Sequence, residues 1–205
     1  MGNGNRRLPL LIHALERAAL SGVGKRRVPL ALCLVEREVR PGAEDWLGVH
    51  APGVPVENPP AEACPIPAVS TTVVRLELVM PLRLRRDGQP LRPDAWQFGD
   101  LFSNLLRRVS MLTEFHTDQP LETDFAGLTE LARQFQLIDC VQDWRPWHRY
   151  SSRQKATLAM DGLIGHVPLP ANGLEPFWPY LWLGQYVLAG AGTSMGQGRY
   201  IIRAT

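Results

Sequence analysis

The chain has few cysteines and none of the paired spacings that build disulfide frameworks or zinc sites. Cys33, Cys64 and Cys140 are odd in number and far apart in the sequence. None of the five histidines lies at metal-ligand spacing from another. We therefore predict no bound metal and no cofactor. Unpaired thiols also favour a reducing compartment, so we expect a cytoplasmic protein.

The chain also lacks a strong excess of charge and a long apolar run. Its formal net charge is only +2, so a polyanionic partner must be argued from where the cations lie. The longest apolar stretch, residues 177–192, is interrupted by Pro179 and Gln185 and is shorter than the ~20 residues of a membrane-spanning helix. With 45% hydrophobic and 20% charged residues, the composition is that of a globular protein without a membrane role.

The first forty residues predict a fragment of a fold. Apolar residues recur at helical spacing over residues 8–21, and Gly22 and Gly24 end that helix. Residues 28–39 have the composition of a strand. Because one helix and one strand cannot bury each other's apolar faces, residues 1–40 are expected to be part of a larger unit.

A proline-rich segment separates this fragment from the rest. Seven prolines lie between Pro41 and Pro67 without sustained periodicity, which predicts an extended linker over residues 41–68. Residues 69–205 then form the second predicted domain.

The second domain shows regular alternation of strand and helix patterns. A two-residue hairpin turn is expected at Asp161-Gly162. The predicted elements are a strand at 74–78, a helix at 93–116 extended by 125–135, strands at 137–160 and 163–169, a helix at 173–189, and a strand at 199–203. This order predicts an α+β, ferredoxin-like (RRM-like) split βαβ domain, with helices on one face of a four-stranded sheet and the other face open.

A glycine loop precedes the last predicted strand. Gly190, Gly192, Gly196 and Gly198 would let the backbone approach a ligand and point amides toward an anion. The same pattern also fits a tight connection that only needs positive φ angles. It fits neither a dinucleotide fingerprint, because the loop follows a helix and precedes a strand, nor a nucleotide P-loop, because no Gly-Lys-Ser/Thr ends it.

Cations and aromatic residues alternate without an acid between residues 145 and 155. Cations neutralise phosphates and flat side chains stack on unpaired bases, so this segment is a candidate RNA-binding surface. The alternative is an exposed hairpin face with solvated arginines. A solvated face is a stronger alternative still for Arg107 and Arg108 on the long helix and for the arginines after the first strand, Arg83, Arg85 and Arg86. The predicted RNA-binding cations are Arg145, Arg149, Arg153 and Lys155 in this segment, with Arg107 and Arg108 on the long helix.

His148 and Tyr150 lie inside that cationic segment. A histidine beside arginines can act as general base or acid in metal-free RNA cleavage, which makes this pair the candidate catalytic residues. The alternative is a surface histidine that contacts a phosphate or nothing. No Ser-His-Asp or Cys-His motif and no evident carboxylate pair is present.

Residues 181–200, with the sequence LWLGQYVLAGAGTSMGQGRY, resemble the C-terminal signature of the CRISPR-associated endoribonucleases that process precursor crRNA. These enzymes belong to the repeat-associated mysterious protein (RAMP) superfamily. Residues 144–154 and 161–165 resemble the hairpin that precedes this signature in one branch of the family. Together these similarities cover most of residues 70–203.

The resemblance implies a role in antiviral defence, with CRISPR repeat RNA or crRNA as partner and CRISPR effector subunits as further partners. The reaction would be a metal-independent attack of a ribose 2′-hydroxyl on the adjacent phosphate. Family members have two tandem ferredoxin-like domains, and residues 1–40 would correspond to the closing helix, glycine loop and strand of the first.

The opening elements of that first domain, where many members carry the cleaving histidine, have no counterpart among the 205 residues. The resemblance therefore does not imply that this chain cleaves RNA. The alternatives are a catalytically inactive crRNA-binding module of an effector complex and a structural subunit that contacts other proteins.

Overall fold

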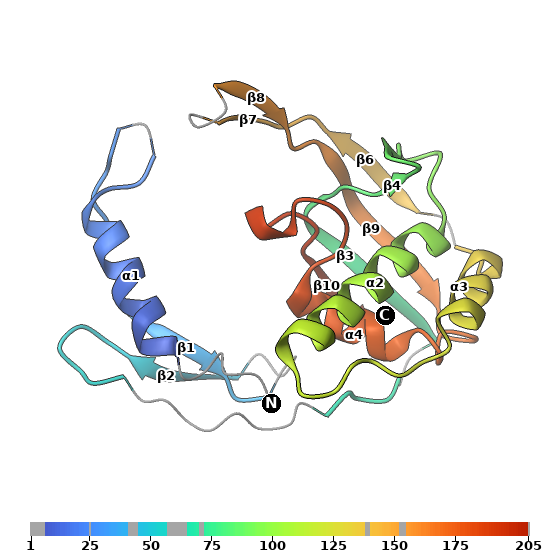
Figure 1. Cartoon of the computed structure of the whole chain (residues 1–205), viewed down its shortest axis with the longest axis horizontal. Helices are drawn as coiled ribbons and strands as arrows, with labels where there is room; N and C mark the ends of the chain where they lie inside the picture. Colours follow the sequence, from blue (N-terminus) through green and yellow to red (C-terminus); the bar gives the residue numbers. More distant parts are fainter. Residues whose placement is uncertain are drawn as a thin grey trace. The chain divides into compact units, whose positions relative to one another are not determined.

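The computed structural model describes residues 7–24, 26–40, 45–56, 65–69, 72–137, 140–151 and 155–204. The chain divides into two compact units, Met1–Pro65 and Ile66–Thr205. Figure 1 shows their elements along the sequence.

In its described residues, the first unit contains a helix and a short hairpin. Helix α1 covers Leu8–Leu20, and β1 (Val35–Glu38) pairs antiparallel with β2 (Trp46–His50). The structure differs from the prediction here, because β1 is shorter than the expected 28–39 strand and β2 lies within the expected linker. No proline lies within β2 itself, and Pro52 follows its end, so no ladder hydrogen bond of the strand is lost to proline.

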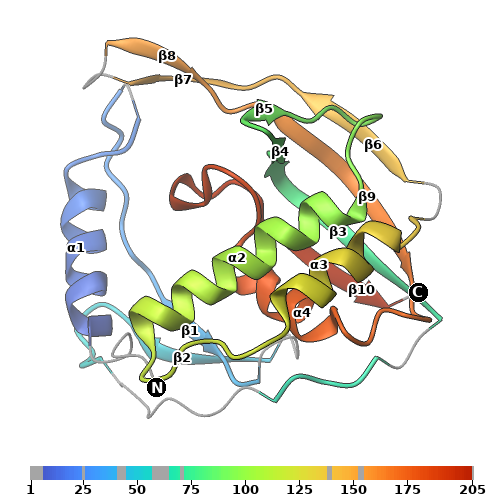
Figure 2. The ribbon, with the colours of Figure 1, turned by 45° about the vertical axis from the view of Figure 1, so that its right-hand side comes forward.

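The second unit confirms the predicted ferredoxin-like α+β fold. Its four-stranded antiparallel sheet has the order β10-β3-β9-β6, so the first strand in sequence lies between the last and the third. Helices α2, α3 and α4 complete the split βαβ order (Figure 2). The bounds are β3 Val73–Leu82, α2 Phe98–His116, α3 Phe125–Gln134, β6 Val141–Arg145, β9 Gly162–Pro170, α4 Trp178–Val187 and β10 Tyr200–Ala204.

One face of this sheet carries the core. Along β3, Val74, Leu76 and Leu78 are buried, whereas Arg75 and Glu77 between them are exposed, as the alternation of a half-buried strand requires. Helices α2 and α4 pack on the buried face (Figure 2). Among the described residues, no helix is long and apolar enough to cross a membrane.

Aromatic rings fix α2 against the segment that opens α4. Phe177 makes edge-on contacts with Phe98 and Phe102, with ring centroids 5.1 and 4.7 Å apart. Tyr180 packs edge-on against Phe102 and donates a hydrogen bond from its hydroxyl to Thr123 Oγ1 at 2.9 Å. These contacts hold α2 and α4 in one orientation.

Helix α4 also lies close to β10 because Gly184 has no side chain. The Tyr200 hydroxyl donates to the Leu181 carbonyl at 2.7 Å, and burial raises the pKa of this phenol. A Cβ on Gly184 would overlap that hydroxyl and lie 2.9 Å from Leu105 Cδ1. The glycine therefore sets the distance between α4 and the sheet.

The predicted 137–160 strand and the hairpin turn at Asp161-Gly162 are wrong. Strand β6 ends at Arg145, and Gly162 is the residue that pairs with Arg145 at the start of β9. Between them the chain leaves the sheet as a separate two-stranded hairpin, which we call the β7–β8 hairpin. Its strands are β7 His148–Ser151 and β8 Ala156–Ala159. A second short hairpin, β4 Arg85–Arg86 with β5 Gln89–Pro90, follows β3.

Candidate functional site

The glycine loop joins α4 to β10 through a short 3-10 helix, η2 (Thr193–Met195). All four predicted glycines have φ angles between +75° and +82°, which side chains rarely adopt. At two of them a Cβ would also meet backbone. A Cβ on Gly190 would lie 2.6 Å from the Arg83 carbonyl oxygen, and a Cβ on Gly198 would overlap the Ala189 carbonyl oxygen. These two glycines are therefore required by the fold itself.

Many amides of the loop are already bonded within the protein. Backbone carbonyls accept hydrogen bonds from the N–H groups of Ala191, Met195, Gly196, Gln197 and Gly198. These amides do not face an anion, so the expected row of anion-binding amides is largely absent from the described loop. Its exposed part is the turn formed by Ser194, Met195 and Gly196.

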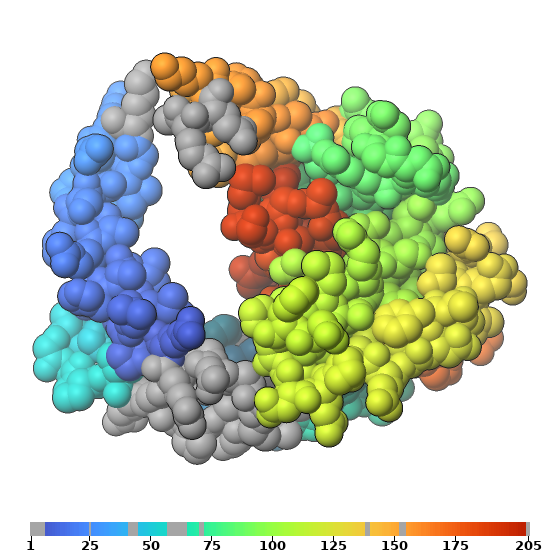
Figure 3. All heavy atoms as spheres, in the orientation of Figure 1, coloured from blue at the N-terminus to red at the C-terminus, as the bar shows by residue number. Residues whose placement is uncertain are grey.

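Gln197 connects the loop to the base of the β7–β8 hairpin. Its side chain is 1% exposed, and its Nε2 donates to the Met160 carbonyl. Met160 in turn donates its N–H to the Trp147 carbonyl at 2.7 Å, which closes the base of the hairpin. Further out, Arg149 Nη1 lies 3.4 Å from Met195 Sδ. In Figure 3 the red atoms of the loop reach the surface beside the orange atoms of the hairpin.

Sequence reasoning missed Gln197 as a site residue. Gln197 is a buried polar residue of the described domain, and it lies between Gly196 and Gly198 in the sequence. A polar residue enclosed by two glycines was the available signal, because close backbone approach on both sides leaves it little space to face solvent.

Arg83 joins three elements at the same end of the sheet. Its Nη1 donates to the Ala159 carbonyl of β8, and its Nη2 lies 3.9 Å from Asp161 Oδ1. Its own carbonyl accepts the Ala191 N–H of the glycine loop at 2.9 Å. Arg83 therefore holds the loop and the hairpin against the end of β3.

The cationic segment does not present a single face. Arg145 ends β6 and is exposed, while Lys155 is exposed at a left-handed turn position with φ +47°. In β7, side chains alternate, so His148 and Tyr150 share one face and Arg149 lies on the other, toward the glycine loop. Arg153 lies outside the described residues.

The candidate catalytic pair is exposed on the β7–β8 hairpin. His148 is exposed and Tyr150 is 63% exposed. Their places two residues apart bring both side chains to the same side of the strand. Among the described residues, no group of three or more His, Cys, Asp or Glu side chains is placed to hold a metal ion.

Neighbouring arginines near α2 have different surroundings. Arg108 Nε donates to the Val187 carbonyl at the end of α4, whereas Arg107 is exposed. Arg86 makes two hydrogen bonds to Asp100, of 3.0 and 2.6 Å. Asp100 raises the pKa of Arg86, through these hydrogen bonds and its charge.

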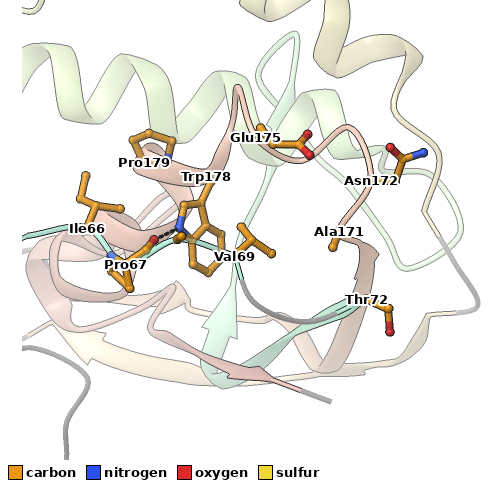
Figure 4. A pocket seen from close by; sticks show the side chains of 10 residues that line it. Ile66, Pro67, Val69, Thr72, Ala171, Asn172, Glu175, Trp178 and Pro179 are labelled. Atoms are coloured by element: carbon orange, nitrogen blue, oxygen red, sulfur yellow. Dashed lines mark hydrogen bonds between the residues drawn. The ribbon is translucent and has the colours of Figure 1, made fainter.

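Pockets on the described part of the second unit include one of about 770 Å³ and one of about 440 Å³. The larger, of about 770 Å³, is at the end of the sheet away from the glycine loop, and Trp178 Nε1 donates to the Pro67 carbonyl within it at 2.5 Å (Figure 4). Its described lining is mostly apolar and includes Glu175 but no cation, so it does not suit a polyanion. The smaller pocket, of about 440 Å³, lies between α2 and the glycine loop and is lined by two arginines.

Comparisons with known proteins find a matching family and structures of similar fold. The family model described as CRISPR-associated endoribonuclease Cas6 matches residues 76–200. The Cas6 structure of Thermus thermophilus superposes with a TM-score of 0.50 at 15% identity, over 66% of this chain and 55% of that chain. A Cas6 product complex superposes with a TM-score of 0.44 at 21% identity, over 65% of this chain and 52% of that chain. The chain thus spans about half the length of these structures. The comparison with curated proteins gives no match.

Proposed function

The chain belongs to the CRISPR-associated endoribonuclease Cas6 family, and we propose that it binds CRISPR repeat RNA and processes precursor crRNA by metal-independent cleavage. The observation that carries this proposal is the joining of the glycine loop to the cationic β7–β8 hairpin through Gln197. The proposed setting is the cytoplasm, with CRISPR effector subunits as further partners.

The β7–β8 hairpin supplies the chemistry of RNA binding. Arg149 and Lys155 bring positive charge, to which Arg145 adds from the end of β6, and Trp147 and Tyr150 bring partly or largely exposed rings. Guanidinium and ammonium groups release counterions from phosphates, while aromatic rings stack on unpaired bases. Because Arg149 reaches Met195, the hairpin charge and the exposed turn of the glycine loop form one continuous surface.

Cleavage would use groups on the same hairpin. A 2′-hydroxyl attacks the adjacent phosphate, the P–O5′ bond breaks, and the products are a 2′,3′-cyclic phosphate and a free 5′-hydroxyl. One protein group removes the proton of the 2′-hydroxyl and another protonates the departing 5′ oxygen. We assign these roles to His148 and Tyr150, which share one face of β7, and the stabilisation of the charged phosphorane to nearby cations.

The first unit has a proposed place in the same family pattern. Helix α1, the left-handed Gly22 and Gly24, and β1 follow the order helix, glycine turn, strand that α4, the glycine loop and β10 repeat in the second unit. We propose that residues 1–40 are the closing part of a first ferredoxin-like domain, that residues 41–68 connect the domains, and that residues 69–205 are the RNA-binding domain.

The experiment is direct. The chain is mixed with the repeat RNA of the CRISPR array in its source genome, in EDTA, and binding and cleavage are measured against salt concentration. Binding that weakens steeply with salt, together with 2′,3′-cyclic phosphate products, supports the proposal. Binding without cleavage indicates the inactive crRNA-binding module of an effector complex. Absence of binding at moderate salt indicates a structural subunit.

A further inference from the structure

The pocket between α2 and the glycine loop is lined mainly by polar and cationic side chains. Its volume is about 440 Å³, within the usual range of small-molecule sites. Its lining combines cationic, hydroxyl and amide side chains with the first turn of the loop: Arg85, Ser103, Asn104, Arg107, Gly190 and Ala191. No carboxylate is among these described lining residues.

The arginines that line the pocket differ from those beside it. Arg83, Arg86 and Arg108 are each hydrogen-bonded within the domain, to Ala159, Asp100 and Val187 respectively. The side chains of Arg85 and Arg107, in contrast, are exposed and have no hydrogen-bond or salt-bridge partner among the described residues. The arginines next to them in sequence hold the fold, and these two are left to face the pocket.

The pocket is lined by α2, the glycine loop and the segment that carries Arg85, and hydrogen bonds from adjacent residues hold these segments in place. Arg108 ties α2 to the end of α4, one residue from Arg107. The Ala191 N–H donates to the Arg83 carbonyl at 2.9 Å, which ties the loop to the segment that carries Arg85. The pocket is therefore preformed, which lowers the entropic cost of binding.

Asn104 keeps hydrogen-bonding groups that its own helix does not use. Its Nδ2 donates to the Asp100 carbonyl at 2.9 Å, one turn earlier in α2. This bond uses one of its two N–H groups and leaves the side-chain carbonyl and the other N–H for a ligand. Ser103 beside it adds a hydroxyl that can donate or accept.

We propose that this pocket holds one unpaired nucleotide of the bound RNA, with its phosphate between Arg85 and Arg107 and its base edge at Ser103 and Asn104. This inference rests on the proposed function and assigns a site for a single nucleotide outside the β7–β8 hairpin. Proteins recognise single-stranded RNA by splaying out a base and bonding its edge, while arginines hold the phosphate.

The test measures repeat-RNA affinity and its salt dependence for Arg85→Ala and Arg107→Ala. Each variant should bind about tenfold more weakly, and the log–log salt slope should become shallower by about 1. The matched control is Arg133→Gln, an exposed helical arginine on α3 with a salt bridge to Glu130. It should bind as the parent chain does, and melting temperatures establish that all three variants are folded.

A second arm identifies the base contact. Each nucleotide of the RNA is replaced in turn by an abasic ribose. One position should cost the parent chain about fivefold or more in affinity, and the same replacement should cost the Asn104→Ala variant nothing further, because the interaction is already lost. Ser103→Ala repeats the measurement without touching the bond to Asp100.

Three results would count against the inference. Normal affinity and salt slope in both arginine variants would remove the pocket from the interface, and if Arg149→Ala then still weakens binding, the proposed function stands without this site. Abasic losses that are the same in parent and Asn104→Ala chains would overturn the base contact. If the parent chain binds no RNA, the proposed function and this inference fall together.

Discussion

Replacing Gly196 by alanine tests whether the glycine loop contacts RNA or only turns the chain. A Cβ at this position would meet nothing within 4 Å, so the substitution creates no clash inside the protein. What remains is the strain of a side chain at φ +82°, which costs about 1 kcal/mol. For a unit of this size, that cost corresponds to a fall in melting temperature of roughly 4 °C.

The effect on binding should be larger than the effect on stability. If RNA backbone lies against the exposed turn, the added methyl holds it away, and we expect affinity to fall about tenfold, a loss of about 1.4 kcal/mol. Gly192→Ala is less informative, because its Cβ would overlap Gln197 Oε1 and disturb the bond to Met160.

The matched control is Gly173→Ala. Gly173 has φ +78°, its Cβ would come no closer than 4.0 Å to another atom, and it lies beyond the other end of β9. Differential scanning calorimetry and fluorescence anisotropy with repeat RNA measure stability and affinity separately. Equal melting temperatures and equal, unimpaired affinities for the Gly196 and Gly173 variants would refute the contact and leave the loop as a turn.

Three further outcomes are expected. Changing Arg149 and Arg153 together to alanine should weaken RNA binding at least tenfold (~1.4 kcal/mol) in a filter-binding assay at physiological salt; unchanged affinity would remove the hairpin from the interface. His148→Ala should abolish cleavage, seen as loss of cyclic-phosphate product on a gel in EDTA, with binding within a few-fold; retained cleavage would eliminate His148 as the catalyst. Gly184→Ala should cost about 1–3 kcal/mol in urea denaturation, because its methyl overlaps the Tyr200 hydroxyl. In a Tyr200→Phe background the cost should shrink, and equal costs in both backgrounds would contradict the packing.

Periodicity predicted the elements whose pattern reflects burial. Phe98, Leu101, Leu105 and Val109 step by three or four residues, and all are buried on one side of α2. The alternation of β3 was equally informative because one face of that strand packs on the core and the other does not. Such patterns depend on local geometry, which the sequence contains.

Long-range contacts explain what the sequence could not reveal. Asp161-Gly162 has the composition of a hairpin turn, but Gly162 is needed for close approach, because a Cβ there would lie 2.8 Å from the Leu82 carbonyl oxygen. Asp161 likewise faces Arg83, which follows Leu82 in the chain and is far from Asp161 in sequence. A glycine required for contact and a glycine required for positive φ look alike in sequence.

The candidate site also depends on long-range contacts that local sequence patterns do not contain. Arg107 and Arg108 are neighbours in sequence, but about 100° of helix rotation separates them, so one is exposed and the other bonds the end of α4. Their different roles depend on where α4 ends, which no local pattern contains. Arg149 and Met195 likewise come together only because the hairpin leaves the sheet between β6 and β9.

The anchoring of the β7–β8 hairpin has a consequence for how this family can diversify. Its base is fixed by the Trp147–Met160 backbone bond, by Gln197 and by Arg83, all of which lie at the sheet. Residues inserted or deleted beyond that base change neither the register of β6 with β9 nor the core, and the entropic cost of a longer loop grows only slowly with its length. The length of the hairpin beyond its base can therefore change independently of the domain beneath it.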